Sequence, residues 1–263
     1  EISECLVGSE MCIRDSQYLL KEEARFDRQR IPTDKQGQEN LLRSLMNVRP
    51  PRPISNDFLK IQDEYLTERN IERGITDVDT LAPVKSDSRL YIWQGDITTL
   101  KCDAIVNACN SQMLGCFSPM HACIDNFIHT YAGMELRLKM HEIMAKQGQE
   151  EETGKAKITS GYNLPTKYIL HTVGPIIQWK VTKEDEDLLA SCYTECLKLA
   201  ADTGVESIAF CCLSTGVFRF PQQRAAEIAT NTVKQYLNKD SRIKKVIFNV
   251  FKDEDLKIYS GLL

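Results

Sequence analysis

The sequence predicts a three-layer α/β/α domain with a mixed, mostly parallel sheet, over about residues 89–263. Two observations predict this fold class. Short continuous apolar runs, typical of strands buried on both faces, recur through this part of the chain. Between them lie stretches whose apolar residues are three and four positions apart, which is typical of amphipathic helices. Strands that alternate with helices form a largely parallel sheet covered by helices on both faces.

The apolar runs and their turn residues give the expected elements in chain order. Strands are expected at residues 90–93, 104–106, 156–160, 168–173, 207–213 and 246–251. One long helix is expected at 120–146 and another, with an acidic first turn, at 185–201. Pro221 is expected at the first position of the next helix, and a short helix closes the chain.

The N-terminal part of the chain lacks the alternation of apolar strands and amphipathic helices. Residues 1–16 show neither helical nor strand periodicity and resemble a translated adapter or vector fragment, so they are interpreted as a non-native leader outside the fold. Residues 17–88 are interpreted as an N-terminal helical extension, with helices expected at 38–46 and 54–73.

Composition excludes several classes of partner. The net charge of -4 and the evenly mixed charges leave no basic face for a phosphate backbone, so nucleic acid is not an expected partner. No apolar run is long enough for a membrane span. Ten cysteines without a secretory signal are expected to be mainly buried thiols in a reducing compartment, which predicts a cytoplasmic protein.

Polar segments follow several of the expected strands. In a parallel sheet the ligand crevice lies beyond the carboxyl ends of the strands. Asp96 and Ile97 follow the first strand, Asn107 and Asn110 the second, and Phe251 lies at the last. The turn Ser214-Thr215-Gly216-Val217-Phe218 can form a backbone nest for a phosphate, although alone it also fits an ordinary strand-to-helix turn.

Five short motifs, in this order, resemble those of macrodomains, the α/β/α family that binds ADP-ribose. They are Gly95-Asp96-Ile97-Thr98, residues 103–111 (DAIVNACNS), residues 153–156 with 161–165 (TGKA, GYNLP), residues 171–175 (HTVGP) and residues 214–218 (STGVF). The resemblance implies that Asp96 accepts a hydrogen bond from the adenine amino group, with the Ile97 backbone beside it. It also implies that Phe251 stacks on adenine, while Asn107, Asn110 and the 214–218 turn contribute to the ligand site.

The segment after the second asparagine departs from the usual hydrolytic macrodomains. Their catalytic aspartate is matched by Asp125, but their glycine run is replaced by the longer stretch 115–123. Cys116, His121 and Cys123 lie within eight positions there, and such soft or borderline ligands favour zinc. Spacing alone leaves buried thiols beside a helix start as an equal alternative. The resemblance to a zinc-dependent bacterial subfamily, found alongside a class M sirtuin that ADP-ribosylates proteins, favours one Zn²⁺ with three protein ligands and an open position.

The resemblance predicts a zinc-dependent hydrolase that removes mono-ADP-ribose from modified proteins, with aspartate or glutamate as the expected linkage residue. Asn110 is expected to hold the ribose hydroxyls, and Asp125 to orient or deprotonate a water. Two alternatives stay open: a non-catalytic reader of ADP-ribose with a structural zinc, and a hydrolase of small ADP-ribose derivatives. His129 is expected to be a core histidine, and His171 to organise the backbone at the Gly174-Pro175 turn.

Overall fold

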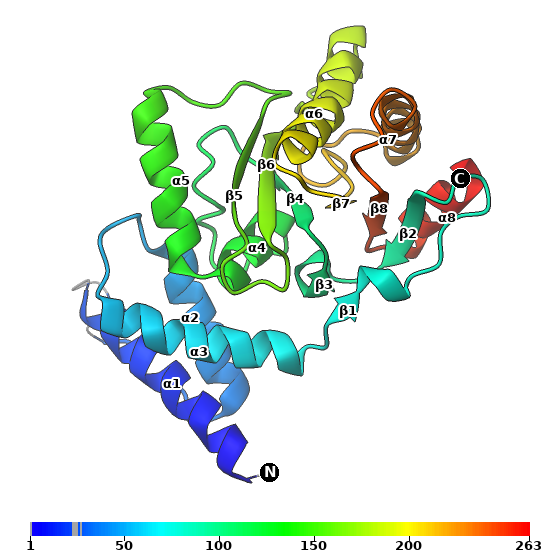
Figure 1. Ribbon diagram of the computed structural model, residues 1–263. Coiled ribbons are helices and arrows are strands. Elements are labelled where there is room, and N and C mark those ends of the chain that lie inside the picture. The colour runs from blue at the N-terminus through cyan, green and yellow to red at the C-terminus, as the bar shows by residue number, and fades with distance from the viewer. Residues whose placement is uncertain (1, 23–25, 27) are drawn as a thin grey trace.

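The computed structural model describes the backbone of residues 2–22, 26 and 28–263, and their side chains from residue 8 onward. Its centre is a six-stranded sheet in the order β2-β8-β7-β4-β6-β5, in which only β5 runs antiparallel to its neighbour (Figure 1). The strands are β2 (Leu90–Gln94), β4 (Ala104–Cys109), β5 (Ala156–Ser160), β6 (Tyr168–Val173), β7 (Ser207–Phe210) and β8 (Lys245–Val250). A two-stranded ladder pairs β1 (Thr76–Asp77) with β3 (Leu100–Lys101).

Helices complete the three predicted layers. Figure 1 shows α6, α7 and α8 side by side, whereas α4 and α5 lie toward the N-terminal helices. The bounds are α4 (Ile124–Ala132), α5 (Met134–Gln147), α6 (Lys183–Asp202), α7 (Gln222–Leu237) and α8 (Asp253–Leu262), with the 3-10 turns η2 (Val78–Thr80) and η3 (Ile97–Thr99). The first turn of α6 carries a reciprocal cap between Thr182 and Asp185, which explains its acidic start.

The strand register brings the site segments to one edge of the sheet. Val106 of β4 lies opposite Phe210 of β7, so the segments after these strands emerge together. Gln94 of β2 lies opposite Val250 of β8, which places Asp96 and Phe251 at the same edge. The predicted fold class is confirmed, and strands β5 and β6 have the predicted bounds.

The expected long helix at 120–146 is wrong. It begins only at Ile124, and Gly133, with φ of 101°, separates α4 from α5. A Cβ at Gly133 would lie 2.7 Å from Gln62 Nε2, and the Gln62 side chain accepts a hydrogen bond from Met134 N at 2.8 Å. Gln62 comes from another helix, so no local periodicity could reveal this break.

Other boundaries shift by a few residues. Strand β4 continues to Cys109 because β6 pairs with it over its whole length, whereas β7 already ends at Phe210. Strand β8 ends at Val250, so Phe251 follows the strand instead of belonging to it. Pro221 is the residue that precedes helix α7, not its first helical residue.

Three helices form the N-terminal part: α1 (Ile2–Lys21), α2 (Lys35–Val48) and α3 (Asn56–Glu72). The predicted helices at 38–46 and 54–73 are therefore present and slightly displaced. The expectation that residues 1–16 take no part in the fold is wrong for the residues described, since Met11 and Cys12 are buried. The non-native origin of this leader stays a prediction.

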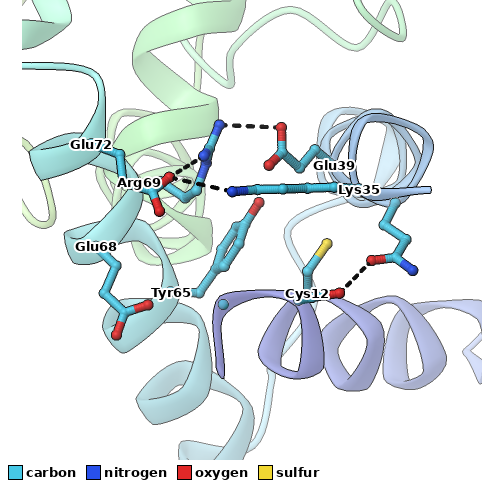
Figure 2. Close-up of a pocket in the computed structure, with 10 residues that line it drawn as sticks. Cys12, Lys35, Glu39, Tyr65, Glu68, Arg69 and Glu72 are labelled. Atoms are coloured by element: carbon cyan, nitrogen blue, oxygen red, sulfur yellow. Dashed lines mark hydrogen bonds and ion pairs between the residues drawn. The ribbon is translucent and has the colours of Figure 1, made fainter. Parts of the chain in front are cut away.

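The N-terminal helices have an apolar cluster of their own. Its members come from α1, α2 and α3, and Met134 of α5 completes it. Figure 2 shows the junction of the three helices, where Cys12 and Tyr65 line a small pocket and Arg69 pairs with Glu39 at 3.1 Å. In the part of the chain that is described, no helix has the length and apolar character needed to cross a bilayer.

Candidate functional site

The loop between β4 and α4, residues 110–123, folds back over helix α4. Three of its residues, Met113, Gly115 and Met120, have left-handed backbone with φ of 56°, 83° and 57°. A Cβ at Gly115 would lie 2.7 Å from the ring of His129 on α4, so this position requires glycine both for its backbone and for its space. We call residues 110–123 the metal loop, because of the side chains that it carries.

Cys116, His121 and Cys123 lie together, as the sequence predicts for a metal site. Their ligand atoms are all within 4.8 Å of one another, and Cys116 Sγ is 3.5 Å from His121 Nδ1. Zinc bonds of about 2.3 Å to sulfur and about 2.0–2.1 Å to nitrogen place neighbouring tetrahedral ligands roughly 3.5–3.8 Å apart, so the group fits zinc after small movements. All three side chains are half-buried, which leaves room for a fourth ligand.

Burial disfavours the charged form of the Cys123 thiol. Burial raises the pKa of Cys123 to about 12, and the neighbouring Cys116 adds to this rise. Cys123 also precedes the first residue of α4, where the free N–H groups of the helix start favour negative charge. A bound metal ion would therefore stabilise the thiolate of Cys123, which burial disfavours.

Asp125 is buried in the first turn of α4, two residues after Cys123. Its Oδ1 accepts a hydrogen bond from Asn107 Nδ2 at 2.8 Å, and His129 Nε2 lies 3.6 Å away. Burial raises the pKa of Asp125 to about 6, while the bond from Asn107 and the charge of Arg137 oppose the rise. Among the described residues, none donates to Asp125 Oδ2, which can therefore accept a hydrogen bond from a ligand or a water.

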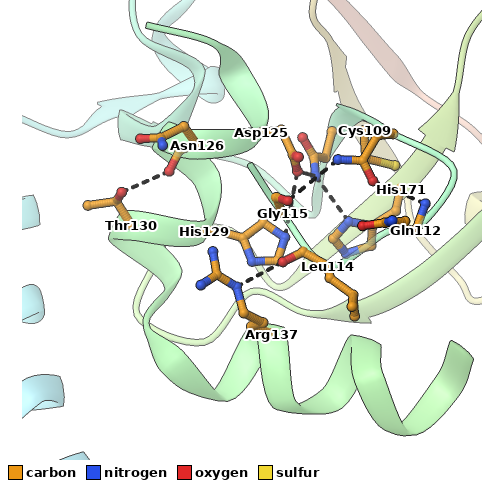
Figure 3. Close-up of polar contacts among 12 residues, drawn as sticks. Cys109, Gln112, Leu114, Gly115, Asp125, Asn126, His129, Thr130, Arg137 and His171 are labelled. Carbon is orange, nitrogen blue, oxygen red and sulfur yellow. Dashed lines mark hydrogen bonds and ion pairs between the residues drawn. The ribbon is translucent and has the colours of Figure 1, made fainter. Parts of the chain in front are cut away.

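Buried polar side chains of the sheet lie against Asp125 (Figure 3). Asn107, on β4, is fully buried and faces His171 Nδ1 at 3.2 Å, and the opposite ring nitrogen of His171 lies 2.9 Å from Thr159 Oγ1. Burial lowers the pKa of His171 to about 3 and the pKa of His129 well below its usual value, so both rings are neutral. His129 is the core histidine that the sequence predicts.

Two expected roles change among these buried polar side chains. His171 contacts the side chains of Asn107 and Thr159, so the prediction that it organises the backbone at the Gly-Pro turn is wrong. Asn107, predicted among the ligand-binding residues, instead holds Asp125 from a position with no exposed surface.

Asn110 lies at the start of the metal loop and is half-buried. Its Oδ1 accepts a hydrogen bond from Gln112 N at 3.1 Å, and its Nδ2 is 3.5 Å from the carbonyl oxygen of Gly115. The amide therefore shapes the turn that leads to Cys116. One of its N–H groups is still available for a ligand.

The segment Ser214–Phe218 after β7 presents backbone donors. In the described chain, the amide N–H groups of residues 215–218 make no hydrogen bond, while the turn is closed by bonds from Phe220 N to Ser214 O (3.0 Å) and from Arg219 N to Gly216 O (3.0 Å). Consecutive free N–H groups form a nest that suits a phosphate. Ser214 has a left-handed backbone (φ 63°), and Ile177 N holds the far end of the segment at Phe218 O.

Asp96, the predicted adenine partner, is fixed by its neighbours. Its Oδ1 accepts hydrogen bonds from Thr98 N (2.9 Å) and Thr98 Oγ1 (2.6 Å), and its Oδ2 pairs with Arg73. The guanidinium of Arg73 also lies 3.5 Å from the centre of the Tyr131 ring on α4. Ile97 is buried beside Asp96, and Phe251 has an exposed ring, with 75% of its surface accessible.

Comparison with known proteins gives the family of this chain. The Macro domain family matches residues 106–229. The "Protein-ADP-ribose hydrolase" of Treponema medium is 55% identical over 249 residues, which cover 94% of this chain and 95% of that protein. This chain belongs to the macrodomain family. A protein of the same name from Staphylococcus aureus strain MRSA252 is 54% identical over 230 residues, covering 87% of this chain and 86% of the relative.

Solved macrodomains have the same fold as the C-terminal part of this one. The Oceanobacillus iheyensis macrodomain with ADP aligns with a TM-score of 0.59 at 38% identity, covering 65% of this chain and 88% of that one. The Trypanosoma brucei macrodomain in complex with ADP-ribose aligns with a TM-score of 0.65 at 28% identity, covering 83% of this chain and 94% of that one.

Sequence reasoning missed three arginines of this macrodomain. Arg43 lies in α2, Arg137 lies in α5 and Arg73 directly follows α3, and each contacts a site segment. An arginine in an amphipathic helix normally indicates a solvated face, so the sequence carried no signal that would have singled them out. Asn107 was found through its motif, but its contact with Asp125 depends on the packing of α4 against β4.

Proposed function

We propose that this macrodomain is a zinc-dependent hydrolase that removes mono-ADP-ribose from modified proteins. The observation that carries the proposal is the adjacency of a three-ligand metal cluster and the buried Asp125. The names of the relatives from Treponema medium and Staphylococcus aureus support the protein-linked substrate. The solved complexes with ADP and ADP-ribose support the nucleotide.

The nucleotide occupies the edge of the sheet where the site segments meet. The free N–H groups of residues 215–218 receive the diphosphate, since a nest of amides binds an anion without a side-chain charge. Asp96 accepts a hydrogen bond from the adenine amino group, with Ile97 beside it, and the exposed ring of Phe251 stacks on the base. The ribose that carries the protein then lies toward the metal loop.

Asp125 and Asn110 act at that ribose. The free Oδ2 of Asp125 orients a water or a ribose hydroxyl and can accept its proton, while Asn107 holds the other oxygen. The amide of Asn110 donates to a ribose hydroxyl with its remaining N–H. Cys116, His121 and Cys123 would hold the zinc ion, which supplies a Lewis acid beside the ribose oxygens when bound.

The substrate is a protein with ADP-ribose linked as an ester to aspartate or glutamate, and its modification is the work of a class M sirtuin. This part of the proposal rests on the resemblance of the metal loop and the N-terminal extension to the zinc-dependent subfamily. A cytoplasmic location is supported by the cysteines, since those that the structure describes are all free thiols.

The test combines metal analysis with hydrolysis of protein that carries aspartate- or glutamate-linked mono-ADP-ribose. Cys116→Ala and His121→Ala are expected to lose zinc and to lose at least about 100-fold in rate. Cys212→Ala is the matched control, because this half-buried cysteine lies outside the metal loop and should leave zinc content and rate unchanged.

Undiminished hydrolysis by metal-free Cys116→Ala would remove zinc from the mechanism. A reader module would bind ADP-ribose but release none from the modified protein. A hydrolase of small derivatives would turn over acetylated or phosphorylated ADP-ribose faster than the protein substrate.

A further inference from the structure

Helix α2 of the N-terminal part contacts the metal loop directly. Arg43 Nη2 donates to the carbonyl oxygen of His121 at 3.2 Å, and Asn47 Oδ1 accepts a hydrogen bond from Met120 N at 3.1 Å. The two bonds therefore hold the backbone on both sides of the peptide that joins Met120 to His121. Arg43 and Asn47 are four positions apart on α2, so they lie on one face of that helix.

The backbone at Met120 needs such support. Its φ of 57° lies in the left-handed region, which is unfavourable for a residue with a Cβ, so surrounding contacts must maintain it. His121 follows Met120 directly. The backbone conformation of Met120 therefore sets the direction of the chain at His121 and decides whether the imidazole faces Cys116. The hydrogen bond that Met120 N donates to Asn47 Oδ1 holds that direction.

The same face of α2 also reaches the start of α4. Arg43 Nη2 donates to Asn126 Oδ1 at 2.8 Å, and Asn126 Nδ2 donates to Ser118 O, also in the metal loop, at 3.0 Å. The guanidinium of Arg43 lies 4.3 Å from the centre of the Phe127 ring. Arg43 thus joins His121 to the helix whose start carries Cys123.

Arg137 of α5 makes a second connection between the metal loop and the carboxyl end of α2. Arg137 Nη1 donates to the carbonyl oxygens of Met46, Asn47 and Arg49 at 2.6–2.9 Å. Its Nε donates to Leu114 O in the metal loop at 2.8 Å, and its guanidinium lies 4.3 Å from the centre of the Phe117 ring. The metal loop is therefore fixed to α2 both before Cys116 and at His121.

We propose that Arg43 and Asn47 are positioning residues for the metal site. Helix α2 then orients the loop that carries the zinc ligands. The inference rests on the proposed function and deepens it. Groups that orient ligand residues commonly change metal affinity by 10-fold to 100-fold when they are removed. The helices before the macrodomain thereby gain a role that their own apolar cluster does not explain.

The test measures zinc affinity of the full chain by competition with a chromogenic chelator, and the visible spectrum of the Co²⁺-loaded protein. Arg43→Met keeps the packing on Phe127 but removes the donors, and it is expected to weaken zinc at least about 10-fold and to alter the Co²⁺ bands. Asn47→Ala should act in the same direction. Arg43→Lys keeps a charged donor, but its shorter side chain ends one bond before the position of Nη2, so it should lie between Arg43→Met and the parent.

Arg69→Met is the matched control, because Arg69 pairs with Glu39 of α2 without contacting the metal loop. It should keep the zinc affinity and Co²⁺ spectrum of the parent, although it removes an arginine from the same helical region. Zinc affinities of Arg43→Met and Asn47→Ala within twofold of the parent would overturn the inference and leave the proposed function intact. A parent chain that binds no zinc would overturn the metal site and this inference together.

Discussion

The loop after β4 presents side chains to the ligand edge of the sheet, whereas the loop after β7 presents backbone amides. Cys116, His121 and Cys123 lie within 4.8 Å of one another in the first loop. In the second, the N–H groups of residues 215–218 are free of partners in the described chain. Side-chain identity should therefore decide function in the first loop, and backbone geometry in the second.

The two loops also differ in what holds them. The metal loop depends on Arg43 and Asn47 of α2 and on Arg137 of α5, which are distant in sequence. The 214–218 segment is closed mainly by bonds within itself and by Ile177 N. A long loop whose three candidate metal ligands must converge needs external support, because its own backbone does not fix the directions of three side chains.

The largest expected effect tests the side-chain chemistry of the first loop. Asp125→Asn keeps the shape of the residue but removes the group that can accept a proton, so kcat should fall about 10²-fold to 10⁴-fold. Zinc content and ADP-ribose affinity should change little. Steady-state kinetics on mono-ADP-ribosylated protein, with calorimetry of ADP-ribose, measures both. A variant that retains a tenth or more of the parent kcat would exclude Asp125 as the base.

The next effect tests the backbone chemistry of the second loop. Val217→Pro removes one N–H from the nest, and loss of a hydrogen bond to a charged phosphate should weaken ADP-ribose about 10-fold to 100-fold. Val217→Ala keeps that N–H and trims a side chain that is 68% exposed, so its affinity should match the parent. Titration calorimetry compares the two. Equal affinities for both variants would argue against a diphosphate at residues 215–218.

A smaller effect is expected at the adenine end. Arg73→Met removes the partner of Asp96 Oδ2 and frees the carboxylate to turn, so KM should rise about 3-fold to 10-fold while kcat is unchanged. Arg242→Met provides a control, since that arginine is half exposed and pairs with Asp240 and Asp202 away from the site. If kcat falls instead of KM rising, Arg73 acts on the reactive end and not on the adenine.

The smallest effect on activity is expected at Asp15 of α1, far from both loops. Burial raises the pKa of Asp15 to about 7, and its Oδ2 has no hydrogen-bond partner among the described residues. Between pH values of about 4 and 7 the unfolded chain releases this proton while the folded chain keeps it, so the folded state loses stability as pH rises. Asp15→Asn should remove that loss and add up to about 4 kcal/mol at pH 8, with little change at pH 3.

Urea denaturation at several pH values measures this difference, and Glu10→Gln, an exposed carboxylate on the same helix, is the control. Hydrolysis rates should be the same for both variants and the parent. Stability at pH 8 that is unaffected by Asp15→Asn would show that α1 does not bury this carboxylate in solution.

The sequence predicted that Cys116, His121 and Cys123 lie together, but it did not predict the contacts of the buried polar residues next to Asp125. Cys116, His121 and Cys123 lie in one short segment, so their proximity is nearly independent of the fold. The pairing of Asn107 with His171, and of His171 with Thr159, joins residues 64 and 12 positions apart on different strands. Only the strand order brings these three together.

The sequence by itself determined the fold class, the strands and the identity of the chemical groups, because apolar periodicity and residue type are local properties of the chain. The tertiary structure alone decided the break at Gly133, where Gln62 packs, and the contact of Arg43 with His121, 78 positions away. The physical reason is that neither the half-buried Arg43 nor the buried Gly133 has a local sequence pattern that predicts its contacts. The function of each is set by the groups that packing brings within hydrogen-bonding distance.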